Sequence, residues 1–164
     1  MKNDIGCSEY VHKIVGVEFS PAPAFDLDEE YKLQQKVAEL IESGIVSSVH
    51  DISEGGLFVT LCEKGFNRNI GFDIKTDNSV RKDAFLFGEA QSRVIVSVSA
   101  EKEETFRKMI GNFSATEIGT VTKETIHING ENWGSIVKWK ELYETAIEKH
   151  LAKELESEAA LSLQ

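Results

Sequence analysis

The chain has 164 residues, of which 41% are hydrophobic and 28% charged, a composition that suits a single globular domain. Its 28 acidic and 18 basic residues give a net charge of −10, which argues against nucleic acid or an anionic membrane as a partner. The longest apolar run is far below the roughly 20 residues of a membrane span, and the first residues lack a signal peptide's apolar region. We therefore expect a cytoplasmic protein.

Residues 1–24 are predicted to be a linker that leads in from an upstream domain. They contain one short helical stretch, Ser8–Val15, and Pro21 and Pro23 prevent that helix from continuing. Two cysteines in the whole chain, Cys7 and Cys62, are too few for a disulfide framework, so both are expected to be reduced.

The clearest helix of the chain begins after Asp26 and ends before Gly44. Asp26 is a good N-cap residue, and Glu29 stands three positions further on, as in a capping box. Leu33 and Val37 follow helical spacing, and Gly44 is a typical residue just past a helix end. The pattern predicts a surface helix with one face on the core.

A Gly-rich turn follows, between a short strand predicted at Ile45–Val49 and a helix predicted at Leu57–Lys64. The turn contains Ser53, Gly55 and Gly56, and a helix that starts here leaves free N–H groups suited to a phosphate or another anion. Alternatively, Ser53 or Asp51 caps the helix and the glycines only permit a tight turn. The local residues favour this second interpretation, because a pair of glycines is a weak signal.

The remaining pattern alternates short strands with helices and does not have the regular order of a doubly wound parallel sheet. It predicts an α+β domain over 25–150, with a mixed β-sheet and helices packed mainly on one face. The nearly continuous apolar run Val94–Val98 is expected to be a central strand. The other strands are expected at 70–74, 117–121, 125–128 and 135–139, the helices at 83–88, 101–110 and 141–151, and a frayed acidic tail at 151–164.

A second polar cluster, Glu89–Arg93, precedes the Val94–Val98 strand. If this strand neighbours the one before the Gly-rich turn, both clusters line one edge of the sheet. Arg93 would then bind a phosphate with two hydrogen bonds, Gln91 and Ser92 would add neutral hydrogen bonds, and Glu89 would orient Arg93. The alternative is a buried Glu–Arg pair that only fixes the entrance of the strand.

His50 is the best candidate for a general base, and Asp51 adjoins it. Neighbouring residues of a strand point to opposite faces, so a dyad is not expected and a structural or hydrogen-bonding role is favoured for His50. His12, His127 and His150 share no ligand spacing with the cysteines, so no metal site is predicted. The chain has no P-loop, dinucleotide fingerprint or nucleophile elbow, and no catalytic residue is assigned.

Two motifs together resemble the last domain of the phosphoribosylformylglycinamidine synthase family. They are His50-Asp51-Ile52-Ser53-Glu54-Gly55-Gly56-Leu57 and, before a strand, Glu89-Ala90-Gln91-Ser92-Arg93. Glu54 and Ala90 stand where the family has Asp and Ser. Segments 3–10 and 117–121 resemble further parts of the domain, so that the likeness runs from residue 3 to about residue 150.

The resemblance implies an aminoimidazole ribonucleotide synthetase C-terminal-domain-like fold and a place in an ATP-dependent ligase. That enzyme converts formylglycinamide ribonucleotide to formylglycinamidine ribonucleotide with ammonia from glutamine. It implies ATP and Mg ligands mainly outside this chain, upstream ATP-binding halves and a glutaminase as partners, and no activity for the domain alone. An isolated domain is also expected to self-associate through an exposed face.

Within this resemblance the role of the domain stays open. One edge of the domain lines either the working site or a pseudo-symmetric site that holds nucleotide without turnover. The residues of this edge that would bind a phosphate are Ser53, Gly55, Gly56, Gln91, Ser92 and Arg93, supported by His50, Asp51 and Glu89. The domain is otherwise a non-catalytic structural module, or it belongs to another family member such as a hydrogenase maturation protein.

Overall fold

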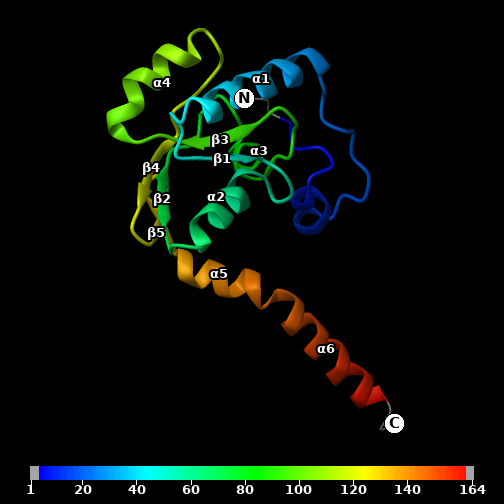
Figure 1. Cartoon of the computed structure of the whole chain (residues 1–164). Helices are drawn as coiled ribbons and strands as arrows, with labels where there is room; N and C mark the ends of the chain where they lie inside the picture. The colour runs from blue at the N-terminus through cyan, green and yellow to red at the C-terminus, as the bar shows by residue number, and fades with distance from the viewer. Residues whose placement is uncertain (1–3, 162–164) are drawn as a thin grey trace.

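The computed structural model describes residues 4–161, with side chains described for residues 4–155. Two β-sheets and their helices form the body of the molecule, and one long helix projects from it (Figure 1). The helices are Tyr10–Val15 (η1, a π-helix), Leu27–Glu42 (α1), Gly56–Phe66 (α2), Lys82–Phe87 (α3), Ala100–Lys102 (η2, a 3₁₀ helix), Glu103–Ile110 (α4), Ile136–Glu144 (α5) and Ala146–Leu161 (α6). The strands are Ser48–Asp51 (β1), Gly71–Ile74 (β2), Val94–Ser97 (β3), Gly119–Thr122 (β4), Thr125–Ile128 (β5) and Glu131–Ser135 (β6).

The larger sheet has four strands in the order β4-β2-β5-β6. It is mixed, because β2 pairs parallel with β5 while the other two pairings are antiparallel. Alternate side chains of β2 and β5 are buried, namely Phe72, Ile74, Ile126 and Ile128, as a strand with one covered face requires. The predicted α+β class with a mixed sheet is confirmed.

Helix α2 covers the buried face of this sheet. It brings Leu57, Phe58, Cys62 and Phe66 into one hydrophobic cluster with the buried residues of β2 and β5. The cluster is completed by Ala84, Phe85 and Leu86 of α3 and by Ile136 of α5. Because α2 is apolar on most of its surface, it packs on several neighbours at once. This packing fixes its N-terminal end beside the start of β3.

The smaller sheet contains only β1 and β3, which pair antiparallel with Asp51 opposite Val94. Helices α1 and α4 lie on one side of this pair in Figure 1 and α2 on the other. The prediction that Val94–Val98 forms a central strand is therefore wrong, and all four residues of β3 are only half-buried. Ile95 packs against the hydrophobic cluster, but β3 has only one neighbouring strand, a difference that an apolar run does not reveal.

The strand predicted at 135–139 is also wrong. Residues 136–139 begin helix α5 and are not a strand, because the Ser135 side chain accepts a hydrogen bond from the Val137 N–H and caps the helix. The described part of the segment from residue 151, predicted to be a frayed tail, belongs to helix α6, which extends to Leu161. Residues 162–164 of that predicted tail lie outside the described residues. In the part of the chain that is described, no helix combines the length and apolar character needed to cross a membrane.

The N-terminal segment packs on the domain more closely than a linker would. Ser8 is fully buried, and the Tyr10 ring stacks on the Phe87 ring with centroids 4.9 Å apart. Asp4 accepts a hydrogen bond from the Ala24 N–H, which holds the two ends of the segment together. The short helix predicted here is present, although as a π-helix. The Asp26 N-cap is confirmed, since its side chain accepts from the Glu29 N–H at 2.9 Å.

Candidate functional site

The pairing of β1 with β3 brings the two polar motifs together. Antiparallel pairing places the end of β1 beside the start of β3, and the Ile52 N–H donates to the Arg93 carbonyl at 3.0 Å. The turn at 52–56 and the cluster at 89–93 therefore share one edge of the molecule. The condition on which the shared edge depended in the sequence, that these two strands are neighbours, is met.

Glu89 occupies the N-terminus of α2. Its Oε1 atom accepts the Gly55 N–H at 2.9 Å, and the same atom accepts the Glu9 N–H at 3.0 Å. Gly55 is the N-cap of α2 and Glu9 is the N-cap of η1, so one carboxylate bridges the starts of two helices. A carboxylate is favourable there because helix N-termini carry partial positive charge. The chain thus supplies its own anion at this position.

The two glycines of the turn are both required by the backbone. Gly55 and Gly56 have φ of +80° and +68°, in the left-handed region that favours glycine. A Cβ atom on Gly56 would lie 2.7 Å from the Cα of Phe87, so α3 also approaches too closely for a side chain. The Gly56 N–H donates to the Ser53 carbonyl at 3.0 Å. The expected side-chain cap by Ser53 or Asp51 is absent, because Gly55 is the N-cap.

Arg93 points into the protein. Its guanidinium donates to the carbonyls of Gly88, at 2.7 Å, and Phe85, at 3.1 Å, at the C-terminal end of α3. Burial lowers the pKa of Arg93 from its ordinary value. The expected contact in which Glu89 orients Arg93 is wrong, as is the alternative of a buried Glu89–Arg93 pair. Each of the two side chains is satisfied by main-chain groups.

Ser92 and Gln91 lie on a different side of this edge, next to α1. A hollow of about 310 Å³ is lined here by Phe25, Glu30, Leu33, Asp51, Ile52, Gln91, Ser92, Arg93 and Val94. Ser92 has a positive φ of 63°, and its hydroxyl donates to Glu30 Oε2 at 2.7 Å. This bond, followed by one from Gln34, lowers the pKa of Glu30 below its ordinary value. With Glu30 and Asp51 on its wall, the hollow carries two acidic groups.

His50 and Asp51 do meet, contrary to the expectation that they point to opposite faces. His50 Nδ1 is 2.6 Å from the Asp51 carbonyl oxygen and 3.5 Å from Asp51 Oδ1. Asp51 is the last residue of β1, where the chain turns away and strict alternation of side chains ends. Among the described residues, His, Cys, Asp and Glu form no group of three or more that could hold a metal ion.

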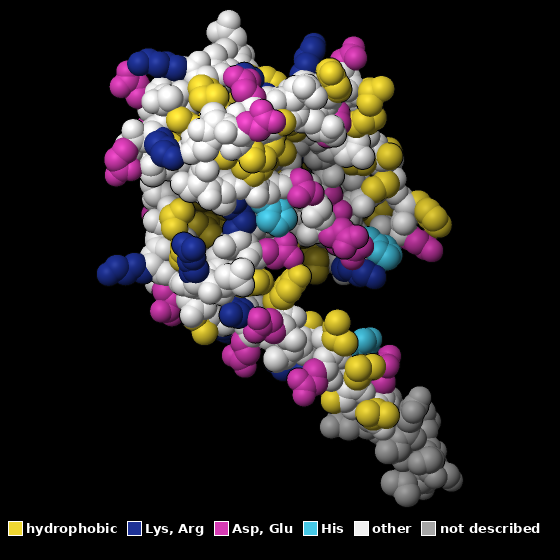
Figure 2. All heavy atoms as spheres, viewed as in Figure 1, with side chains coloured by type: hydrophobic (Ala, Val, Ile, Leu, Met, Phe, Trp, Pro, Cys, Tyr) yellow, Lys and Arg dark blue, Asp and Glu magenta, His cyan; other side chains and the backbone are white. Residues whose placement is uncertain are grey.

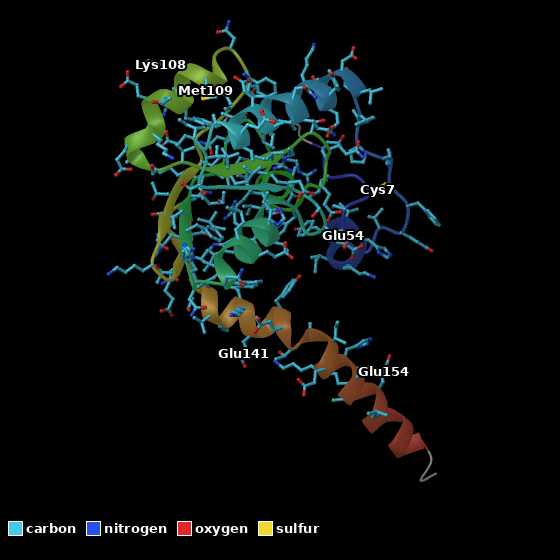
Figure 3. The ribbon with its side chains drawn as sticks, in the orientation of Figure 1. Cys7, Glu54, Lys108, Met109, Glu141 and Glu154 are labelled. Atoms are coloured by element: carbon cyan, nitrogen blue, oxygen red, sulfur yellow. The ribbon has the colours of Figure 1, made fainter. Side chains whose placement is uncertain are left out.

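Seven of the nine predicted residues fall into two places. Gly55, Gly56 and Glu89 lie beneath the N-terminal segment, and Glu54, labelled in Figure 3, stands close to that segment. Asp51, Gln91, Ser92 and Arg93 line the hollow next to α1. Ser53 and Gln91 are the exposed side chains among the six proposed ligand-binding residues.

Two groups that contribute to the site were not predicted from the sequence, namely the Glu30 side chain and the main chain of Glu9. Glu30 precedes Leu33 by three residues and Val37 by seven, so it lies on the inward face of α1. A carboxylate in line with apolar residues is the signal that identifies it. No comparable signal exists for the Glu9 N–H, because main-chain contacts of a loop leave no pattern in the side chains.

Sequence comparison shows the relationship directly. Residues 3–129 match the family model described as AIR synthase related protein, C-terminal domain. The PurL subunit of phosphoribosylformylglycinamidine synthase from Thermoanaerobacter sp. (strain X514) is 36% identical over 85% of this chain and 21% of its own length. The PurL subunit from Caldanaerobacter subterraneus subsp. tengcongensis is 34% identical over the same shares. The chain therefore spans about a fifth of the length of these relatives.

Solved structures show the same fold. Thermotoga maritima PurL complexed with FGAR superimposes with a TM-score of 0.63 at 17% identity, over 77% of this chain and 23% of that one. The structure of PurLQS from the same organism gives a TM-score of 0.57 at 17% identity, over 75% of this chain and 22% of the other. With its fold and its matched sequence in agreement, the chain belongs to the AIR synthase-related C-terminal domain family.

Proposed function

We propose that this chain is the C-terminal domain of a PurL-type phosphoribosylformylglycinamidine synthase. The observation that carries the proposal is the 36% identity to a PurL subunit over 85% of this chain. The two motifs shared with that family also meet at one edge of the fold. The whole enzyme would use ATP, Mg and glutamine-derived ammonia to convert formylglycinamide ribonucleotide in cytoplasmic purine biosynthesis. The domain alone would be inactive.

In this proposal the edge at 53–56 and 91–93 faces an anionic part of the substrate or nucleotide. Ser53 and Gln91 would contact it directly, since both side chains are exposed. Gly55 and Gly56 would shape the turn and Ser92 would lie beside it. Arg93 would act indirectly, by holding the Gly88 and Phe85 carbonyls and so the entrance of β3. A phosphate that reached the α2 N-terminus would compete with the Glu89 carboxylate.

The upstream part of the same enzyme is the proposed partner of the N-terminal face. Large hydrophobic side chains are exposed there in a manner unusual for a free surface, namely Ile14, Val15, Phe19, Phe25, Leu27 and Tyr31. The relatives contain about four-fifths of their length beyond the matched part, enough to cover this face. The ATP and Mg ligands, and the contact with a glutaminase, would come from that remainder.

A second candidate function is a purely structural module, and one observation favours it. The groups that would bind phosphate already have partners within the chain: Gly55 with Glu89, Gly56 with Ser53, and Arg93 with two carbonyls. In that case the edge would fix the domain against its neighbours without contacting a ligand.

Steady-state kinetics of the full-length synthase distinguish the two functions. Ser53→Ala combined with Gln91→Ala removes the exposed polar groups and is expected to raise KM for one substrate about tenfold, with an unchanged thermal midpoint. Arg68→Ala, a change at an exposed site away from the edge, is the matched control. Wild-type kinetics in the double variant would exclude ligand contact by this edge. Wild-type kinetics together with lost stability in Arg93→Ala would establish the structural module.

A further inference from the structure

Helix α6 carries an apolar stripe that nothing in the described chain covers. Ile147, Leu151 and Leu155 are exposed by 77%, 53% and 67%. They are spaced four residues apart, so they lie on one face of the helix. The helix projects from the body, and Figure 2 shows hydrophobic side chains along it in open view. It lies outside residues 3–129, which match the family model.

Acidic residues border this stripe. Glu148 precedes Leu151 by three residues and Leu155 by seven, and Glu154 follows Leu151 by three and Ile147 by seven. Both spacings place the carboxylates beside the stripe. Glu154, labelled in Figure 3, stands on the projecting part of α6. Its Oε1 lies 3.5 Å from His150 Nε2.

The two lysines of the helix, Lys149 and Lys153, face the other way. Lys149 and Lys153 are each two positions from Leu151, and residues two apart lie on opposite sides of a helix. The surface around the stripe is therefore acidic although the helix as a whole contains both signs. Charge complementarity then selects a partner with basic residues around an apolar groove.

A second copy of the chain fits this surface poorly. The border of its stripe carries the same two acids, Glu148 and Glu154, and so it does not supply the basic residues that charge complementarity selects. The acidic border therefore favours a basic partner over a second copy.

We propose that α6 is a docking helix whose Ile147–Leu151–Leu155 stripe inserts into an apolar groove edged by Lys or Arg on a partner protein. Amphipathic helices bind such grooves through anchors spaced by three or four residues. A helix that projects into water is only marginally stable on its own, so occupation of the groove would also stabilise α6. The surface is separate from the edge at 53–56 and 89–93, and it does not depend on the activity proposed above.

The proposal is tested on the full chain with two synthetic helical peptides of about 18 residues that share a leucine stripe. One peptide has Lys beside its stripe and the other has Glu. In fluorescence anisotropy the Lys peptide is expected to bind at least about tenfold more tightly than the Glu peptide. Leu151→Ser with Leu155→Ser should weaken its binding about tenfold without any change in net charge. The opposite-face control, Lys149→Arg with Lys153→Arg, also keeps the net charge and should retain full binding.

Charge reversal provides an independent readout. Glu148→Lys with Glu154→Lys should transfer the preference to the Glu peptide. Equal binding of the two peptides to the wild-type chain would overturn the proposal, as would full binding by the Leu151→Ser, Leu155→Ser variant. A dimer in analytical ultracentrifugation that this variant abolishes would also overturn it, because the occupant would then be a second copy.

Discussion

The Glu89 carboxylate lies 2.9 Å from the Gly55 N–H, at the N-terminus of α2 where an external anion would otherwise bind. The same oxygen holds the Glu9 N–H, so it fastens the N-terminal segment to the Gly-rich turn. The anion site that the sequence motif suggests is therefore already occupied by a carboxylate of the same chain. This contact joins three segments that are far apart in the chain.

Removal of the Glu89 carboxylate is expected to destabilise the chain. Glu89→Ala leaves the two N-cap N–H groups without their acceptor and should lower the free energy of unfolding by about 1–2 kcal/mol. Glu89→Gln keeps an acceptor without the charge and should cost less. Urea unfolding measures both, with Glu54→Gln as the exposed neighbouring control. Limited proteolysis should show faster cleavage within residues 7–20 of the Ala variant, and unchanged rates would mean that the bridge does not hold this segment.

Arg93 is expected to be more sensitive than an exposed arginine. Arg93→Ala removes two hydrogen bonds and leaves the Phe85 and Gly88 carbonyls without these donors, so we expect a loss of about 2–4 kcal/mol. Arg93→Lys retains the charge without the forked geometry and should recover only part of the stability. Arg68→Ala is the control. Equal unfolding midpoints for the Arg93→Ala and Arg68→Ala variants would contradict a structural role for this guanidinium.

The sequence predicts the helices and strands around the site better than it predicts the hydrogen bonds between them. Periodicity and turn residues locate α1, α2 and β2, because these features depend on local pattern. The pairing of β1 with β3 joins segments distant in the sequence, and the sequence offers it only as a condition. The partners of Glu89 and Arg93 are main-chain groups from segments distant in the sequence, and side-chain identity carries no record of such partners. The strand predicted at 135–139 fails for a related reason, since apolar residues there suit a strand and a helix equally well and a single cap at Ser135 decides between them.

Two glycines separate the effect of backbone conformation from that of close packing. Gly44 and Gly56 have nearly equal φ values of +66° and +68°. An added Cβ meets nothing within 4 Å at Gly44 but lies 2.7 Å from the main chain of Phe87 at Gly56. Gly44→Ala should therefore cost about 1 kcal/mol, the ordinary penalty of a left-handed residue, and Gly56→Ala clearly more. Unfolding midpoints that agree for the two variants would show that α3 can move away from the turn.

The Ser92–Glu30 contact predicts a dependence of stability on acid pH. Hydrogen bonds from Ser92, and next from Gln34, lower the pKa of Glu30 in the folded chain below its ordinary value of 4.5. A lowered folded pKa contributes stability above about pH 4.5, and this contribution is lost as the pH falls through the folded value. Ser92→Ala should therefore be less stable than wild type at about pH 7, and the difference should shrink towards about pH 3. Urea titrations at several pH values measure it, with Ser47→Ala as the control. A difference that does not change with pH would assign the effect to backbone strain at Ser92 instead.

The two cysteines are expected to differ sharply in reactivity. Cys7 is exposed, whereas Cys62 is 3% exposed within the α2 core, and burial followed by the nearby Glu63 charge raises the pKa of the Cys62 thiol to about 12. A thiol reagent at about pH 8 should react rapidly with Cys7 and with Cys62 only after unfolding, because the thiolate is the reactive form.

The raised pKa of Cys62 also predicts a loss of stability as the pH rises above 9.0, the ordinary thiol value, because the unfolded thiol ionises there while the folded thiol remains protonated. Tyr143, whose pKa is raised by its hydrogen bond to Glu63, also titrates at alkaline pH, so the test compares wild type with Cys62→Ala. The variant should lose less stability between about pH 8 and pH 11, and parallel curves for the two proteins would exclude Cys62 as the source.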